Sequence, residues 1–311
     1  MSLSRSLLDG SPAKATFGGV SFYTRDEINT PLAPEWDDVV TSLYGAIDKA
    51  PRDFLIEVPL RLWGAWENLS TLFPAGVLNP VIGALLQDTS DSALVIHGRN
   101  QDRITFHNAI ITRLADLYLG IDAEIFAADV VFSALIRNGY NPEDASSYFT
   151  VDTAAFSHDF AKTNYKRQRY SGAWGAVAGF TAFQGLAGVN IGWDLSLDPV
   201  YSANVGTIAH KISGFRGTCR CLPVEPTMAQ LVAGAGFQGA SAPLGRLLSA
   251  GPTAAADLTW TGSGVSVVLK NASIVSTGFA WGQAPLRKGE TVWETTRGFS
   301  AGSPAAVATI A

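Results

Sequence analysis

Cysteine and histidine are scarce in this sequence, and their scarcity excludes several kinds of chemistry. The 311 residues include two cysteines and four histidines. Two cysteines are too few for a disulfide framework. Cys219 and Cys221 stand two positions apart in a strand-like stretch, so their side chains point to the same face, and they have no second pair at zinc-site spacing. The histidines lack metal-motif spacing as well, so we expect no metal and no cofactor; they are His97, His107, His158 and His210.

Long apolar runs are missing too. No segment approaches the roughly 18 consecutive apolar residues that span a bilayer, and residues 1–19 lack the apolar centre of a signal peptide. We therefore expect no membrane partner and a reducing compartment. Only 16% of the residues are charged, whereas 47% are hydrophobic. This composition is ample for two cores and favours β-rich domains that other subunits partly cover.

Two motifs that suggest catalysis or cofactor binding have simpler explanations. Residues 234–239 spell G-x-G-x-x-G and Asp257 follows, but a helix-like stretch precedes the glycines where a dinucleotide fold requires a strand. Ser157, His158 and Asp159 are adjacent, whereas a catalytic triad needs its three groups in one hydrogen-bonded line. No two carboxylates stand out as an acid–base pair. We predict that the chain is not an enzyme.

What the sequence does contain is an internal repeat. Residues 93–112 return about 160 positions later as residues 257–275. Each copy has two apolar, strand-like runs around a Gly-containing hairpin, and ends in Asn-Ala at Asn108 and Asn271. Two copies of this length predict two similar domains rather than a solenoid.

The expected elements follow the same order in both copies: strands, a long loop, strands, one short helix, the hairpin and a further strand pair. The helices are expected at residues 66–73 and 225–232, with Pro226 in the first turn of the second. We predict a mainly β fold, a β-sandwich or barrel with one short flanking α-helix per domain, duplicated in tandem. The predicted boundaries are 1–160 for the first domain, with an N-terminal arm and a long acidic loop at 24–38, then 161–175 for a basic linker and 176–311 for the second domain.

Charge is divided unevenly between the halves. Residues 1–160 hold ten Lys/Arg and 21 Asp/Glu, while residues 161–311 hold twelve and six. Either the two surfaces drifted independently, or the first domain of one chain faces the second domain of a neighbour. Contacts of that head-to-tail kind close into rings when the rotation permits. The one dense basic cluster is interleaved with aromatic residues and is expected to make linker and interdomain contacts, with nucleic-acid binding as the alternative; it contains Lys162, Lys166, Arg167 and Arg169.

The repeated unit resembles the tail tube domain of long-tailed bacteriophages, which is related to the tube proteins of contractile injection machines. The pattern at residues 104–112, the short helix before it and the closing stretch 267–297 carry the resemblance. It implies a β-sandwich flanked by a helix, six such domains in a ring, and stacked rings around a channel. Because this chain carries two domains, we expect three chains per ring. The alternative is a hexamer whose second copies decorate the outside.

The resemblance also implies a place and a set of partners. It implies a structural protein of the virion tail, assembled in the host cytoplasm. Its partners would be further copies of itself, other tail proteins, and the DNA and tape measure protein that pass through the channel without specific binding. The acidic loop 24–38 and its counterpart 197–206 are the candidates for ring-to-ring contact, through Asp26, Glu27, Glu35, Asp37, Asp38 and Asp198.

Two alternatives remain open at this point. Another tail component with a related fold, such as a distal tail or tail terminator ring, would carry the same domain. A two-domain β-sandwich carbohydrate-binding protein would also be rich in Trp and Gly. That second alternative predicts exposed tryptophan platforms at Trp63, Trp66 or Trp260.

Overall fold

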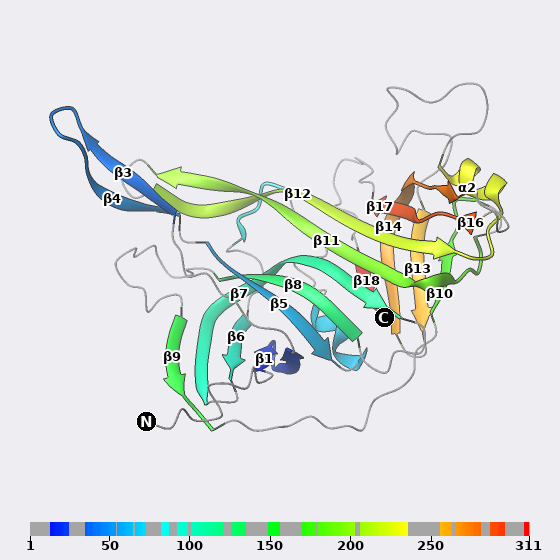
Figure 1. Cartoon of the computed structure of the whole chain (residues 1–311), viewed down its shortest axis with the longest axis horizontal. Helices are drawn as coiled ribbons and strands as arrows, with labels where there is room; N and C mark the ends of the chain where they lie inside the picture. Colours follow the sequence, from blue (N-terminus) through cyan, green and yellow to red (C-terminus); the bar gives the residue numbers. More distant parts are fainter. Residues whose placement is uncertain are drawn as a thin grey trace.

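The protein is mainly β, as the sequence predicts, and its strands fall into two units that follow each other along the chain (Figure 1). The computed structural model describes residues 13–24, 35–53, 55–64, 66–72, 82–86, 92–98, 101–120, 126–134, 149–155, 170–177, 180–202, 206–235, 256–262, 265–280, 287–295 and 308–310. The first unit contains β1 (Ala13–Phe17), β2 (Val20–Thr24), β3 (Glu35–Thr41), β4 (Gly45–Asp53), β5 (Ile56–Gly64), the 3₁₀ helix η2 (Trp66–Leu72), β6 (Ser92–His97), β7 (Asp102–Leu119), β8 (Phe126–Ala134) and β9 (Phe149–Thr153). The second unit contains β10 (Ser171–Trp174), β11 (Gly185–Ser202), β12 (Gly206–Pro223), the helix α2 (Met228–Gly234), β13 (Ala256–Gly262), β14 (Val265–Ser276), β15 (Phe279–Ala280), β16 (Arg287–Lys288), β17 (Thr291–Thr295) and β18 (Ala308–Ile310).

Six strands of the first unit close into an antiparallel barrel. They pair in the order β1-β2-β5-β8-β7-β6, and β6 returns to β1. The sequence of β5 shows why this strand has an inner face, because Val58, Leu60 and Leu62 are buried while Glu57 and Pro59 between them are exposed. Alternation with a period of two turns every second side chain into the barrel.

The second unit repeats this ring of pairings. Its strands pair in the order β10-β13-β14-β17-β12. Phe183 and Gln184, just before β11, close the ring between β10 and β12. Phe183 forms a bridge with Gly172 of β10, and the Gln184 carbonyl accepts a hydrogen bond of 2.9 Å from the Val224 N–H, which follows β12. The first unit closes at the equivalent place, where one residue pair links β2 to β5.

The two units agree in residue register as well as in strand order. In the β6–β7 hairpin Leu94 pairs with Phe106, and in the β13–β14 hairpin Leu258 pairs with Leu269. A β-bulge precedes Leu94 and Leu258 alike. The β7–β8 and β14–β17 pairs also share the position of a bulge, and β9 pairs with β7 as β18 pairs with β14. The second unit is therefore built on the same hydrogen-bond framework as the first.

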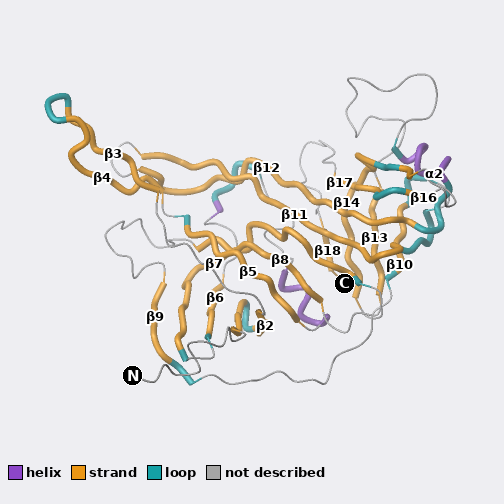
Figure 2. Tube along the Cα trace, in the orientation of Figure 1, coloured by secondary structure: helices purple, strands orange, loops and turns teal. Residues whose placement is uncertain are grey.

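One long strand joins the units into a single sheet (Figure 2). On one edge β11 pairs with β12, and on the other it pairs with β7 of the first unit. The junction with β7 runs from Val189, opposite Leu119, to Asp194, opposite Arg113. Its β12 partner continues alongside over the first unit, as Figure 1 shows.

Both expected helices lie at the predicted places, with corrections in detail. The first is a 3₁₀ helix. The second begins later than predicted, because the Thr227 hydroxyl accepts a hydrogen bond from Gln230 N and the Gln230 side chain bonds back to Thr227 N. This capping box fixes the start of α2 at Met228, so Pro226 precedes the helix instead of lying in its first turn.

The predicted linker range 161–175 overlaps a strand. Within it, β10 pairs with β13 in the way that β1 pairs with β6. Trp174 at the end of β10 is buried and takes the place that Phe17 has in β1. A large apolar side chain at this position therefore anchors β10 in the second unit.

Candidate functional site

Two long hairpins project from the barrels toward the same end of the molecule (Figure 1). Hairpin A is formed by β3 and β4 and spans residues 35–53. Hairpin B is the outer half of β11 and β12 and comprises residues 196–202 and 206–214. The two lie beside each other, with β4 next to β12.

Hairpins A and B are equivalent residue by residue. Trp36 pairs with Pro51 in hairpin A as Leu197 pairs with Ile212 in hairpin B, and each of these pairs follows a β-bulge. A second bulge follows the next three pairs in both hairpins. The residue is identical at four equivalent positions, which are Asp37 and Asp198, Val39 and Val200, Gly45 and Gly206, and Ile47 and Ile208.

The acidic residues predicted for ring-to-ring contact lie on these hairpins where they are described. Glu35, Asp37 and Asp38 are on β3, and Asp198 is on β11. The prediction of a loop is therefore wrong for these four residues. A two-stranded hairpin has both faces near solvent, so carboxylates are tolerated there and acidity does not separate loop from strand. Asp26 and Glu27 lie outside the described residues.

Hairpin A carries large apolar side chains in solvent. Its tip exposes Leu43 and Tyr44, each 77% accessible, and its strands expose Val40 and Ile47. The ion pair from Lys49 Nζ to Asp38 Oδ1 is 3.9 Å long and exposed on both sides, so it contributes little to stability. An isolated two-stranded hairpin is at best marginally stable in water. Exposed apolar groups on such an element indicate a contact surface.

Hairpin B is held against the first unit. The side chains of Ala209, His210 and Ile212 are buried. The Gly83 N–H donates to the Ile212 carbonyl at 2.8 Å, and the Ile212 N–H donates to the Ala84 carbonyl at 2.9 Å. The first unit thus adds a short strand segment to the outer edge of hairpin B.

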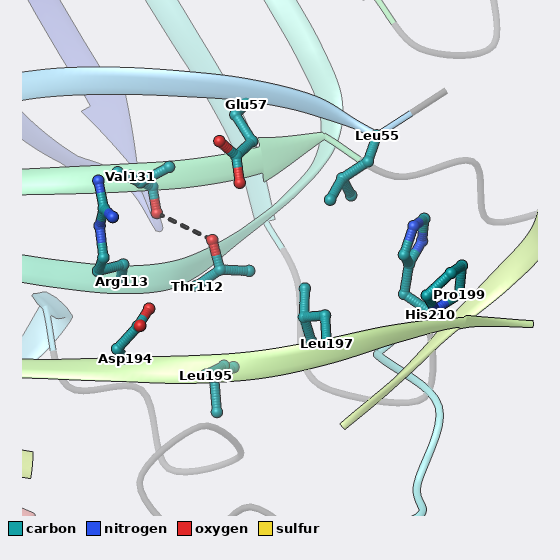
Figure 3. A pocket seen from close by; sticks show the side chains of 10 residues that line it. All are labelled: Leu55, Glu57, Thr112, Arg113, Val131, Asp194, Leu195, Leu197, Pro199 and His210. Carbon is teal, nitrogen blue, oxygen red and sulfur yellow. Dashed lines mark hydrogen bonds between the residues drawn. The ribbon is translucent and has the colours of Figure 1, made fainter. Parts of the chain in front are cut away.

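A pocket of about 320 Å³ lies where β11 leaves β7 and hairpin B begins (Figure 3). Arg113, Asp194 and Glu57 form a charged wall, and Figure 3 shows the Arg113 and Asp194 side chains on the same side of the pocket. Burial holds the pKa of the Asp194 carboxyl above its ordinary value, and the nearby Arg113 guanidinium offsets part of this rise. The opposite end is mostly apolar, so the pocket suits a group with one polar and one apolar side; the remaining lining residues are Leu55, Thr112, Val131, Leu195, Leu197, Pro199 and His210.

The motifs that suggested cofactor chemistry have structural roles or lie outside the described residues. Helix α2 ends at Gly234, so a helix precedes the glycine run. Asp257 accepts hydrogen bonds from Lys270 Nζ at 2.7 Å and from the Asn271 N–H at 3.2 Å. These bonds tie β13 to β14. Outside the described residues are Ser157, His158, Asp159 and the basic cluster of Lys162, Lys166, Arg167 and Arg169.

The two cysteines lie on the same face of β12, as their spacing predicts, and this is the face turned toward the core of the second unit. Cys219 and Cys221 are both buried and free. The Trp260 indole N–H donates to Cys219 Sγ at 3.3 Å, and burial raises the pKa of Cys219 to about 12. Both thiols therefore behave as small apolar groups at neutral pH. By register they stand where β5 has Val58 and Leu60.

Neither metal ligation nor membrane insertion by a helix has support within the described residues. No group of three His, Cys, Asp or Glu side chains among them could hold a metal ion. The His97 ring nitrogen Nε2 bonds to the Ala154 carbonyl at 2.8 Å, which ties β6 to the residues after β9. None of the helices in the described ranges is long and apolar enough to cross a membrane.

The tryptophan platforms predicted by the carbohydrate-binding alternative do not form at Trp260. This side chain has 0% exposure, because it lies on the inward face of β13. Trp63 is half-buried, and the Arg61 guanidinium carbon lies 5.9 Å from the centre of its ring. The side chain of Trp66 lies outside what the structure describes.

Comparison of the chain with protein-family models and with curated proteins gives no match.

Proposed function

We propose that the chain is a structural virion protein, the major tail tube subunit of a long-tailed phage, which assembles into stacked rings around a DNA-conducting channel. The observation that carries the proposal is the pairing of β7 with β11, which joins two barrels of the same framework edge to edge within one chain. A unit that pairs with the next unit in this way can repeat the contact from chain to chain. Such a series closes into a ring when the rotation per unit permits.

Charge and composition support the same proposal. The chain has a net charge of −5, and a protein of net negative charge repels the phosphates of DNA instead of binding them. The exposed apolar tip of hairpin A is a surface that assembly would bury. With two units per chain, a ring of six units takes three chains.

Negative-stain imaging and native mass spectrometry of the purified chain test this proposal together. We expect rings or tubes with a central hole wide enough for duplex DNA, and a ring mass of three chains. Sixfold rings of six chains would reject the trimer and favour the hexamer with decorating second copies. A chain that remains monomeric at high concentration would reject the function itself.

The copy number of the protein in purified virions separates this proposal from related tail roles. A major tube subunit is expected to be among the most abundant virion proteins. A distal tail or terminator ring would be present in only one or two rings per particle. The measurement is quantitative mass spectrometry of virions against the capsid protein.

A further inference from the structure

We propose that hairpin A of one chain docks on the second unit of another chain, in the way that hairpin B docks on the first unit within a chain. This inference rests on the proposed self-assembly and names the surface that would perform it. It starts from the equivalence of the hairpins, which share register, both bulge positions and the glycine that begins their second strand. Two copies of one element are expected to use the same kind of contact.

The environments of the two hairpins differ at equivalent positions. In hairpin B, Ala209 and His210 are buried. Their equivalents in hairpin A, Asp48 and Lys49, are exposed. Within the described part of the chain, β3 and β4 form a two-stranded sheet of their own, whereas hairpin B belongs to the main sheet. Hairpin A therefore presents a surface that hairpin B has already covered.

The strand position beside which hairpin B begins has an equivalent in the second unit. Hairpin B begins where β11 leaves β7, at the pair of Asp194 with Arg113, six residues before β7 ends at Leu119. By register, Ser276 at the end of β14 stands where Arg113 stands in β7. Ser276 is exposed, and after Thr277 and Gly278 the chain forms β15, which pairs with β16. The end of β14 is the position on the second unit where a further hairpin would lie.

Charge favours a second copy of this chain as the partner. Hairpin A contains five acidic and two basic residues. Residues 161–311 hold twelve Lys/Arg and six Asp/Glu. A negative hairpin and a half-chain of net positive charge attract each other, and contacts between like-charged surfaces are disfavoured. Because hairpin and receiving edge lie on different units, the contact is head-to-tail and continues into a ring.

Substitutions in hairpin A test the inference on the full-length chain. The variant V40D/L43D/Y44D places charges at three exposed apolar positions, so the fold should be retained and ring formation should be lost. We expect the concentration at which rings form to rise by at least about 100-fold. The matched control is V151D, because Val151 is 68% exposed on β9, away from the hairpin, and this variant should assemble like wild type. Circular dichroism spectra and Tm values establish that each variant is folded.

Mixing two defective variants tests the direction of the contact. The second variant, S276E, places a carboxylate at the proposed receiving edge, and it too should fail to form rings alone. Mixed with the hairpin A variant, it should form a one-to-one dimer that grows no further, because each chain retains one intact half of the contact. Sedimentation velocity measures this product.

The outcomes separate the inference from the function. Rings formed by wild type and by the hairpin A variant alike would overturn the inference and leave the ring proposal standing. A mixture that forms no dimer would also overturn it, since it would mean that hairpins contact each other symmetrically or that β14 is not the receiving edge. A wild-type chain that never associates would overturn both.

Discussion

The two barrels use one hydrogen-bond framework and fill it with different side chains. In the first unit Phe17 and Phe132 meet edge to face, with ring centres 5.0 Å apart. Their register equivalents in the second unit are Trp174 and Trp293, whose ring centres are 6.4 Å apart. The rings of Phe180 and Phe183 also pack against Trp293.

The larger aromatic core is offset by a smaller residue on an adjacent strand. In the first unit Ala15 pairs with Ile96, and at the equivalent position of the second unit Gly172 pairs with Trp260. A Cβ atom on Gly172 would lie 2.8 Å from atoms of the Trp260 ring. The two units therefore share backbone pairing and bulge positions, while the side-chain volume that fills each core is distributed differently among the equivalent residues.

The largest expected effect comes from emptying the aromatic core of the second unit. Trp293 is fully buried against three aromatic rings, so Trp293→Ala should lower the free energy of unfolding by about 3–5 kcal/mol. Trp293→Phe, which installs the residue found at Phe132, should cost about 1–2 kcal/mol because most of the volume remains. Urea unfolding followed by tryptophan fluorescence and far-UV circular dichroism measures both. Equal losses for the two variants would show that the units do not share this position.

A smaller effect is expected where the two cores exchange volume. Gly172→Ala should cost about 1–3 kcal/mol, because the added methyl group overlaps Phe183 and Trp260 and the core must shift. Gly175→Ala is the matched control, since a Cβ atom there meets nothing within 4 Å. Adding Trp260→Ile to Gly172→Ala recreates the pair of the first unit. The double variant should be more stable than the sum of its single changes predicts, and strict additivity would refute the exchange.

Sequence patterns revealed the parts of this fold that have one buried face. The β6–β7 and β13–β14 hairpins were predictable because apolar residues alternate along them and Gly98 and Gly262 end the first strand. The sequence indicates strands over 39–47 and 206–222, which overlap hairpins A and B, but it predicts a loop at 35–38 and 198–202, where the structure has strand. These segments project from the barrels, and carboxylates interrupt any alternation. The similarity of the two hairpins is still visible in the sequence, because four identical residues recur at a constant separation, from Asp37 and Asp198 to Ile47 and Ile208.

The junction between the units could not be predicted from sequence. It is made by backbone hydrogen bonds between β7 and β11, and any residue except proline can supply these groups. The pocket beside the junction gathers Glu57, Arg113 and Asp194 from three strands far apart in the chain. No local spacing relates these residues. The acidic composition of residues 1–160 indicated a contact surface but not its shape.

The smallest expected effect concerns an ion pair that the first unit has and the second lacks. Arg103 on β7 and Asp152 on β9 form two side-chain hydrogen bonds, one of them 2.7 Å from Arg103 Nε to Asp152 Oδ1. By register Ser266 stands on β14 where β7 has Arg103. The hydrogen bonds from Arg103 lower the pKa of Asp152 below its ordinary value. Its stabilisation is therefore complete above the unfolded pKa of about 4, and is lost as pH falls through the lower folded value.

Asp152→Asn should therefore lower Tm slightly at pH 7 and leave it unchanged at a pH below the folded pKa of Asp152. The effect is small because both side chains are exposed and solvent screens the pair. Arg103→Gln should give the same small loss at pH 7, and the double variant should lose no more than either single one, because each change removes the same interaction. Calorimetric Tm values from pH 7 to pH 3 measure the set. A difference between wild type and Asp152→Asn that persists unchanged to pH 3 would mean that the side chain, and not its charge, holds β9 against β7.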